Sequence, residues 1–477
     1  MICLKPMNQK KPILYIFFLS LTAAVGGFLF GYDTAVISGT IGQVSLQFDL
    51  NALEQGWYVG CALLGSILGV AIAGRLSDQW GRKKVMILSA LLFAVSALGC
   101  AITHSFEALV IYRIIGGAGI GMVSIVSPMY ISEVAPSKFR GSLVALYQLA
   151  ITVGFLGAYL VNYQLLKWSA SDFFSENTLL HLIIHQEVWR GMLGMELLPA
   201  LLFLLILFAI PESPRWLVIH ERNADAEKVF KQLYESRELA MQKIVEVKEQ
   251  AAKTTATHWG LLKNPKILKP VLYGMAIAIL GQFMGVNAVL YYGPGIFEQS
   301  GLSGGDALYY QVMVGLVNVM TTILALLIID KVGRKQLVYF GVSGMVISLL
   351  MISIYFTYGE SLGWTSMVLL VLFLVYIFCT AISISAVIFV LLSEMYPNKI
   401  RGLAMSIAGF SLWVGTYLVG QLTPWFLENL GPSGTFLFFA IMCLPYMYII
   451  WKKIPETAGK SLEDIEAYWL GTDTDKI

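Results

Sequence analysis

Long apolar runs alternate with short polar loops along almost the whole chain. A helix needs about 20 apolar residues to cross the hydrocarbon core of a bilayer. Twelve runs approach or exceed that length, at 13–37, 54–74, 85–103, 108–131, 141–163, 188–210, 270–296, 308–329, 336–358, 365–392, 401–427 and 433–451. The pattern therefore predicts an all-α membrane protein with twelve transmembrane helices.

The composition supports this prediction. Of the 477 residues 57% are hydrophobic and 13% are charged, and the mean hydropathy is +0.72. Soluble domains carry about 25% charged residues. The net charge of +2 gives no electrostatic reason to expect nucleic acid as a partner.

The five cysteines show no metal-binding or disulfide spacing, and four lie in apolar runs, at Cys61, Cys100, Cys379 and Cys443, with Cys3 near the start of the chain. We expect them to pack as small apolar residues, and we expect no metal and no cofactor.

Lys and Arg mark one side of the predicted membrane. They follow spans two, four, eight and ten, at 75–84, 138–140, 331–335 and 399–401. The loops at 38–53, 104–107, 297–307, 359–364 and 428–432 carry none, and Lys167 in the loop at 164–187 is the exception. By the positive-inside rule both termini and the polar segment 212–269 are cytoplasmic. The first run follows two lysines as a signal peptide would, but it is long and has no cleavage site, so we take it as a span.

Three motifs recur in the same order in the two halves of the chain. "DQWGRKK" at 78 returns as "DKVGRKQ" at 330, "SEVAPSKFRG" at 132 as "SEMYPNKIRG" at 393, and "PESP" at 211 as "PETA" at 455. This indicates a duplicated six-helix unit and the major facilitator fold, with a site between the halves near the midplane. We expect a first half at 1–211, a cytoplasmic helical linker at 212–269, a second half at 270–455 and a cytoplasmic tail at 456–477.

The motifs together resemble the sugar porter family of the major facilitator superfamily. They are "GRLSDQWGRKK", "PMYISEVAPSKFRG", "PESPRWL", "QFMGVNAVLYYGPGIF", "LLSEMYPNKIRG" and "PETAGKSLEDIE", and they follow the family order over nearly the whole chain. Within the family the chain is most similar to bacterial proton-coupled symporters, those of xylose in particular. The resemblance implies a multi-pass protein of the cell inner (cytoplasmic) membrane.

Three ionisable residues interrupt apolar spans of the first half: Asp33, Arg113 and Glu196. A charge within the bilayer must be paired or neutralised, and Asp33 and Arg113 are the natural pair. The resemblance implies that all three take part in proton coupling. The alternatives are a fixed structural ion pair and, for Glu196, a position facing the watery loop side.

Amides and aromatic rings in several spans could bind a sugar, since amides match hydroxyls and rings cover the apolar face of a pyranose. By the resemblance, the sugar-contacting candidates are Phe30, Gln148, Gln282, Asn287, Tyr291, Asn318 and Trp413. An amide in a membrane helix can instead bond a neighbouring helix. Tyr291 and Tyr292 could also belong to an outer gate, where we expect "YYGPG" to break the helix.

The repeated charged motifs indicate a cytoplasmic gate. Its candidates are Asp78, Arg82, Glu133, Arg140, Asp330, Arg334, Glu394 and Arg401. A network of opposite charges at helix ends can bias an equilibrium between two states of the protein. The alternative is that these charges only fix topology.

The glycine runs "GVAIAG" at 69 and "GGAGIG" at 116 follow no strand and lie within spans, so we expect close helix packing and no phosphate binding. Three positions depart from the family pattern: Phe155 and Gly281 replace glutamines, and Phe389 replaces a tryptophan. They leave the identity of the sugar open.

We therefore expect proton-coupled import of a monosaccharide, a pentose or hexose, by alternating access, in a protein that is not an enzyme and is a monomer. A passive facilitator with Asp33 as a relic is the alternative of the same fold. A transport-inactive sugar sensor fits less well because the tail after 456 is short. An intramembrane enzyme lacks catalytic motifs here, and a drug exporter would have fewer amides around its cavity.

Overall fold

The computed structural model describes residues 10–136, 139–170, 186–234, 236–253, 259–397, 400–457, 460 and 462–470. Within this part of the chain, twelve helical segments are long and apolar enough to cross a membrane: Pro12–Gly39, Ala52–Trp80, Arg82–Ile102, Phe106–Val134, Arg140–Ser169, Val188–Ala209, Pro265–Glu298, Gly304–Ile329, Arg334–Tyr358, Ser366–Met395, Arg401–Asn429 and Gly431–Lys452. Each overlaps one predicted span, so the prediction of twelve transmembrane helices is confirmed. Several helices run past the apolar stretch because their polar ends can continue into water.

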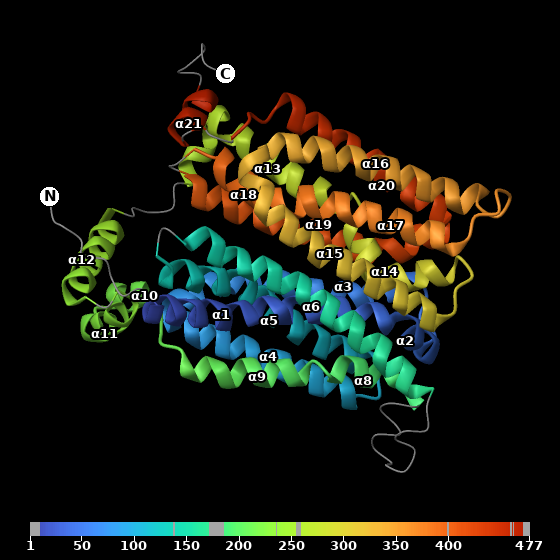
Figure 1. Ribbon diagram of the computed structural model, residues 1–477, viewed down its shortest axis with the longest axis horizontal. Helices are drawn as coiled ribbons and strands as arrows, with labels where there is room; N and C mark the ends of the chain where they lie inside the picture. The colour runs from blue at the N-terminus through green and yellow to red at the C-terminus, as the bar shows by residue number, and fades with distance from the viewer. Residues whose placement is uncertain are drawn as a thin grey trace. The chain divides into compact units, whose positions relative to one another are not determined.

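In the part that the structure describes, the first six spans and the short helix between spans one and two consist of nine regular elements, which can be followed in Figure 1. They are α1 (Lys10–Val36), the 3-10 turn η1 (Ile37–Gly39), α2 (Ile41–Phe48), α3 (Ala52–Trp80), α4 (Arg82–Ile102), α5 (Phe106–Val134), α6 (Arg140–Ser169), α8 (Val188–Gly194) and α9 (Leu197–Ala209). The polar segment that follows forms α10 (Pro214–Ile219), α11 (Asn223–Tyr234), α12 (Arg237–Lys253) and the 3-10 turn η4 (Trp259–Lys263).

The last six spans begin with the two parts of span seven. The elements are α13 (Pro265–Gln282), α14 (Val286–Glu298), α15 (Gly304–Val332), α16 (Arg334–Tyr358), α17 (Ser366–Thr380), the π-helical turn η5 (Ala381–Ser385), α18 (Ala386–Met395), α19 (Arg401–Asn429) and α20 (Gly431–Lys452). A short helix, α21 (Leu462–Leu470), comes near the end of the chain.

Packing divides the chain into two compact units. The first holds residues 1–33, 68–154 and 194–256, and the second holds 34–67, 155–193 and 257–477. These units are defined by packing, whereas the predicted halves are defined by the sequence repeat. The predicted domain boundaries therefore stay a prediction.

Small residues bring helices of the first unit into close contact. A Cβ atom added to Gly69 would run into the Ala118 carbonyl, and one added to Gly154 would run into the Phe28 carbonyl. Gly119 is nearly as tight, since its Cβ would lie 3.2 Å from the Ser89 carbonyl oxygen. The prediction that these glycine runs serve helix packing is confirmed at Gly69, Gly116 and Gly119, whereas a Cβ atom added to Gly74 would meet open space.

The polar helices of the first unit lie near the first residues of α1, as Figure 1 shows for α10, α11 and α12. The Tyr15 hydroxyl donates to Gln232 Oε1 at 3.1 Å, which connects α1 with α11. In α11 the apolar residues Ala226, Val229, Phe230 and Leu233 are buried on one face, which explains why a largely polar segment folds into a packed helix.

In the second unit α16 packs along α17 and α20, and α13 packs along α19. Trp469 of α21 donates from Nε1 to the Met395 carbonyl at 2.8 Å, which holds α21 against the end of α18. The cysteines predicted to pack as small apolar residues, Cys61, Cys100, Cys379 and Cys443, are buried as expected, while Cys3 lies outside the described residues.

Three spans are interrupted. Span six breaks at 195–196 between α8 and α9, span seven breaks at 283–285 between α13 and α14, and span ten contains the π-helical turn η5. Gly285 has a φ of 91°, a value that favours glycine.

The prediction that "YYGPG" breaks span seven is therefore wrong in its position. Tyr291 to Gly295 lie inside the continuous helix α14, with Pro294 in its interior. The break occurs about two turns earlier, where Gly285 adopts its left-handed conformation.

Candidate transport site

Asp33 and Arg113 form an ion pair in the interior of the first unit. Asp33 lies near the last turn of α1 and Arg113 lies in the first half of α5. Arg113 Nη1 donates to Asp33 Oδ1, and the two side chains are 3% and 0% exposed. The structure thus contains the predicted pair, in a place where water does not screen it.

Glu196 joins this pair from the break in span six. It is 2% exposed and lies close enough to Asp33 and Arg113 for its charge to act on both. The charge of Glu196 also acts on the hydroxyl of Tyr32 and on the thiol of Cys100. The alternative that Glu196 faces the watery loop side is wrong, because the side chain is buried beside the pair.

The charge balance of this cluster indicates what it can do. One arginine cation faces two carboxylates, so the fully ionised cluster has one excess negative charge. Because an uncompensated charge is costly in a dry interior, uptake of one proton by either carboxylate leaves the cluster neutral. The arrangement is therefore suited to binding and releasing one proton.

The break in span seven brings two predicted sugar-binding amides together. Asn287 donates from Nδ2 to Gln282 Oε1 at 2.8 Å, and Thr416 donates from its hydroxyl to the same oxygen at 3.1 Å. Because the oxygen of Gln282 has two donors, its amide nitrogen is the group best placed to donate to a ligand.

The other predicted sugar contacts are distributed over both units. Tyr291, Asn318 and Trp413 are buried in the second unit, on α14, α15 and α19. Phe30 and Gln148 are half-buried in the first unit, on α1 and α6. Tyr292 donates from its hydroxyl to the Gly420 carbonyl at 2.6 Å, which ties α14 to α19.

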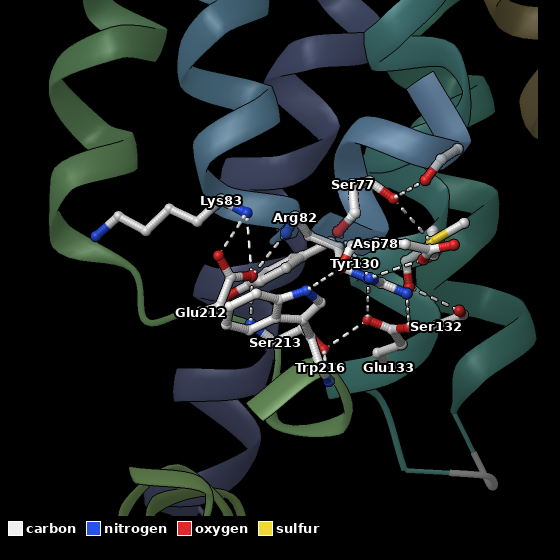
Figure 2. Close-up of polar contacts among 12 residues, drawn as sticks. Ser77, Asp78, Arg82, Lys83, Tyr130, Ser132, Glu133, Glu212, Ser213 and Trp216 are labelled. Carbon is white, nitrogen blue, oxygen red and sulfur yellow. Dashed lines mark hydrogen bonds and ion pairs between the residues drawn. The ribbon is translucent and has the colours of Figure 1, made fainter. Parts of the chain in front are cut away.

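Three of the four predicted gate residues of the first half, Asp78, Arg82 and Glu133, form a compact polar cluster (Figure 2). Arg82 donates from Nε and Nη2 to the two carboxylate oxygens of Glu133, both at 3.0 Å, in a bidentate pair. Its Nη1 donates to Asp78 Oδ1 at 3.3 Å and to the Ser77 carbonyl at 2.9 Å. Arg82 and Glu133 are largely buried, whereas the Asp78 side chain is 74% exposed.

Glu212 completes this cluster, although the sequence analysis did not assign it a role. Its carboxylate accepts the backbone N–H groups of Arg82 and Lys83 at the first turn of α4. Lys83 donates from Nζ to the Ile210 carbonyl beyond the end of α9 at 2.7 Å. The Ser213 hydroxyl donates to Glu133 Oε2 at 2.5 Å. Spans three, four and six are thereby joined at one end.

The second half repeats this arrangement with the corresponding residues. Arg334 donates from Nη2 to Glu394 at 3.1 Å, and the Thr457 hydroxyl donates to the same carboxylate at 2.6 Å. The Lys335 N–H donates to Glu456 at 3.1 Å, and Lys335 Nζ donates to the Ile454 carbonyl at 2.9 Å. The signal that could have identified Glu212 and Glu456 is the repeat of "PESP" as "PETA".

The remaining gate candidates are Arg140, Arg401 and Asp330. Arg140 is exposed at the start of α6, and Arg401 Nη2 donates to the Tyr396 carbonyl at 3.4 Å. The side chain of Asp330 lies outside the described residues. The ion pairs above form within each half, and a lock between the halves stays a prediction.

Among the residues that the structure describes, no group of three or more His, Cys, Asp or Glu residues is arranged to hold a metal ion.

Twelve spanning helices, a repeated charge cluster at corresponding helix ends and a buried ion pair define a secondary transporter of the major facilitator type. The family model described as "Sugar (and other) transporter" matches residues 19–469. The chain belongs to this sugar transporter family.

Relatives of similar length support this assignment. The arabinose-proton symporter of Bacillus subtilis is 34% identical over 465 residues, which cover 98% of this chain and 97% of the relative. The D-xylose-proton symporter of Escherichia coli is 35% identical over 495 aligned residues, covering 97% of each. The inward-open structure of the xylose transporter XylE from E. coli matches with a TM-score of 0.81 at 35% identity, over 95% of this chain and 100% of that chain.

Proposed function

We propose that this protein imports a monosaccharide, a pentose or a hexose, together with a proton by alternating access. The observation that carries the proposal is the buried cluster of Asp33, Arg113 and Glu196, which becomes neutral when it takes up one proton. Relatives that are named as proton symporters of arabinose and xylose support the same substrate class.

In the proposed cycle a proton reaches Asp33 from outside and weakens its pairing with Arg113. Sugar binding between the halves then permits the turn inward, and release of the proton inside restores the pair. Gln282 would donate from its amide to a sugar hydroxyl while Asn287 and Thr416 hold its oxygen. Phe155, Gly281 and Phe389 are the positions at which the choice of sugar would differ from the family pattern.

We further propose that the protein is a monomer in the cytoplasmic membrane with both termini inside. The charged loops that follow spans two, four, eight and ten support this orientation. The polar helices α10, α11 and α12 and the two charge clusters would then face the cytoplasm, where the clusters would stabilise the outward-open state.

The proposal is tested by uptake in proteoliposomes. A panel of labelled pentoses and hexoses is offered with and without an inward proton gradient, to the wild type and to Asp33→Asn. We expect one sugar to accumulate only with the gradient. The variant should still exchange sugar but should not concentrate it, because an amide cannot take up and release the proton.

Asp49→Asn is the matched control. Asp49 is an exposed aspartate with a φ of 51°, a conformation that asparagine tolerates well. This variant should accumulate sugar as the wild type does. Uptake that ignores the gradient in the wild type would instead make the protein a passive facilitator with a structural Asp33.

A further inference from the structure

Pro294 lies in the interior of α14 and leaves one backbone carbonyl without its helical donor. Proline has no N–H, so the carbonyl four residues earlier, that of Leu290, lacks the usual hydrogen bond. An unpaired carbonyl in a membrane interior costs several kcal/mol. The structure supplies this carbonyl with other donors.

Two side chains donate to the Leu290 carbonyl. The Tyr159 hydroxyl lies 2.9 Å from the oxygen and Gln311 Nε2 lies 3.2 Å from it. Tyr159 and Gln311 are 1% and 0% exposed. The Tyr159 ring packs so tightly on α15 that a Cβ added to Gly315 would lie 2.7 Å from it. Shape and polarity both hold the hydroxyl in this place.

The two donors come from different halves of the transporter. Tyr159 belongs to span five and Gln311 to span eight, and Leu290 lies in span seven. All three lie in the second compact unit, towards the ends of spans five and seven that are predicted to face outside. The bond from Tyr159 therefore joins the halves on that side, whereas the bond from Gln311 stays within the second half.

We propose that Tyr159 is a positioning residue of the outer gate, whose hydroxyl holds the outer ends of the two halves together by bonding the carbonyl that Pro294 releases. This inference rests on the proposed function, since a gate matters only for alternating access. When the outer side opens, Tyr159 leaves and Gln311 remains on the carbonyl. The Leu290 oxygen thus stays bonded in both states, and opening breaks one hydrogen bond without leaving the carbonyl bare.

The test measures the outer opening directly. Spin labels are attached to cysteines introduced at Leu46 and Leu362, which are 86% and 56% exposed and belong to different halves, in a background that lacks the five native cysteines. Double electron–electron resonance then measures the distances between the two labels, which give the populations of the closed and open outer side. Tyr159→Phe should raise the ratio of open to closed by about fivefold, as expected for one hydrogen bond of about 1 kcal/mol.

Tyr147→Phe is the matched control. Tyr147 is 6% exposed and its hydroxyl donates to the Val123 carbonyl at 3.3 Å, within the first half and away from the charge cluster. It loses the same kind of bond, but one that does not join the halves. The label distances should therefore stay as in the parent protein.

Pro294→Ala tests the link between the proline and the tyrosine. Alanine restores the helical N–H, which competes with Tyr159 for the Leu290 oxygen. Pro294→Ala should shift the populations towards the open state, and Tyr159→Phe should add less in this background than in the parent, since the two changes act on one bond. The proposal is overturned if Tyr159→Phe shows the same distance distribution as the parent protein, or if the effects of the two changes are additive.

Transport kinetics provide a second measurement. If the outward-open state becomes about fivefold more populated, the KM for external sugar should fall by up to the same factor. The label distances do not require transport, so they test the gate even if the sugar or the proton coupling has been assigned wrongly. If the wild type shows no gradient-driven uptake, this result counts against the proposed function and not against the contact between Tyr159 and the Leu290 carbonyl.

Discussion

Asp33 and Arg113 illustrate what a charged residue inside a membrane span requires. Each alone would be costly in hydrocarbon, by roughly 2.5–3.5 kcal/mol on insertion scales. Together they form a buried ion pair, and Glu196 adds a second carboxylate that the sequence could not place. The role of these three residues in proton coupling stays a prediction, which Asp33→Asn tests.

At the same scale, Gln282 offers a test of the sugar site. Gln282→Glu keeps an oxygen for Asn287 and Thr416 but removes both amide N–H donors. If the amide donates to the sugar, the KM should rise by about tenfold, the effect of one lost hydrogen bond of roughly 1.4 kcal/mol. The measurement is counterflow uptake over a range of sugar concentrations.

Thr416→Val is the control for this change, since it removes only one of the two donors to the Gln282 oxygen. Its KM should rise by a smaller factor. A wild-type KM in Gln282→Glu would show that this amide serves helix packing and not sugar binding, the alternative that any amide in a membrane helix presents.

At the scale of elements, each half joins the start of one span to the end of another in the same way, spans three and six in the first half and spans nine and twelve in the second. A glutamate accepts backbone N–H at the start of a helix, from two residues in the first half and one in the second, while the lysine there donates to carbonyls at the end of another helix. Glu212 and Lys83 do this in the first half, and Glu456 and Lys335 do it in the second. The anion also lies at the positive end of the helix dipole.

Glu212→Ala and Glu456→Ala should therefore destabilise the protein by similar amounts. Each removes the acceptor of part-buried N–H groups, those of Arg82 and Lys83 in the first variant and that of Lys335 in the second, and one such hydrogen bond contributes about 1 kcal/mol. Thermal melts of the detergent-solubilised protein should show a lower Tm for both variants. Glu249→Ala, at an exposed side chain of α12 away from its first turn, should leave the Tm unchanged. A loss in one half only would contradict the equivalence of the two clusters.

The Glu212 carboxyl also makes the stability of the folded protein depend on pH. Burial raises the pKa of Glu212 above its ordinary value of 4.5. The folded protein then holds this proton more tightly than the unfolded chain, so its contribution to stability falls as pH rises from the unfolded pKa to the folded pKa.

The glutamine in Glu212→Gln cannot lose a proton, so the stability of this variant lacks the pH-dependent contribution of the carboxyl. The Tm difference between Glu212→Gln and the wild type should therefore move in favour of the variant as the pH rises through that interval. The measurement is a pair of pH-dependent melting curves. A difference that stays constant with pH would contradict the raised pKa.

At the scale of the whole molecule, proton coupling limits how far a sugar can be concentrated. One charge moving through 100 mV is worth about 2.3 kcal/mol, which corresponds to roughly fiftyfold accumulation. With one proton per sugar, proteoliposomes at 50 mV and no pH difference should reach only about sevenfold. The measurement is the steady-state accumulation at several imposed potentials, and the slope of its logarithm against the potential gives the number of charges moved per sugar.

A slope twice as steep would mean two protons per sugar and would bring Glu196 into the coupling beside Asp33. Zero slope at every potential, with uptake still present, would mean that the protein is a facilitator.

The sequence by itself determined the twelve spans, the duplication and the family, because hydropathy, loop charge and repeated motifs are local properties of the chain. It also indicated the pair of Asp33 and Arg113, since a charge in an apolar span needs a partner. Only the tertiary structure decided where span seven breaks. Pro294 can stay inside α14 because Tyr159 and Gln311 bond the carbonyl that it releases, and neither donor is near it in sequence. In the same way, Glu212 and Glu456 acquire their partners only when distant helix ends meet.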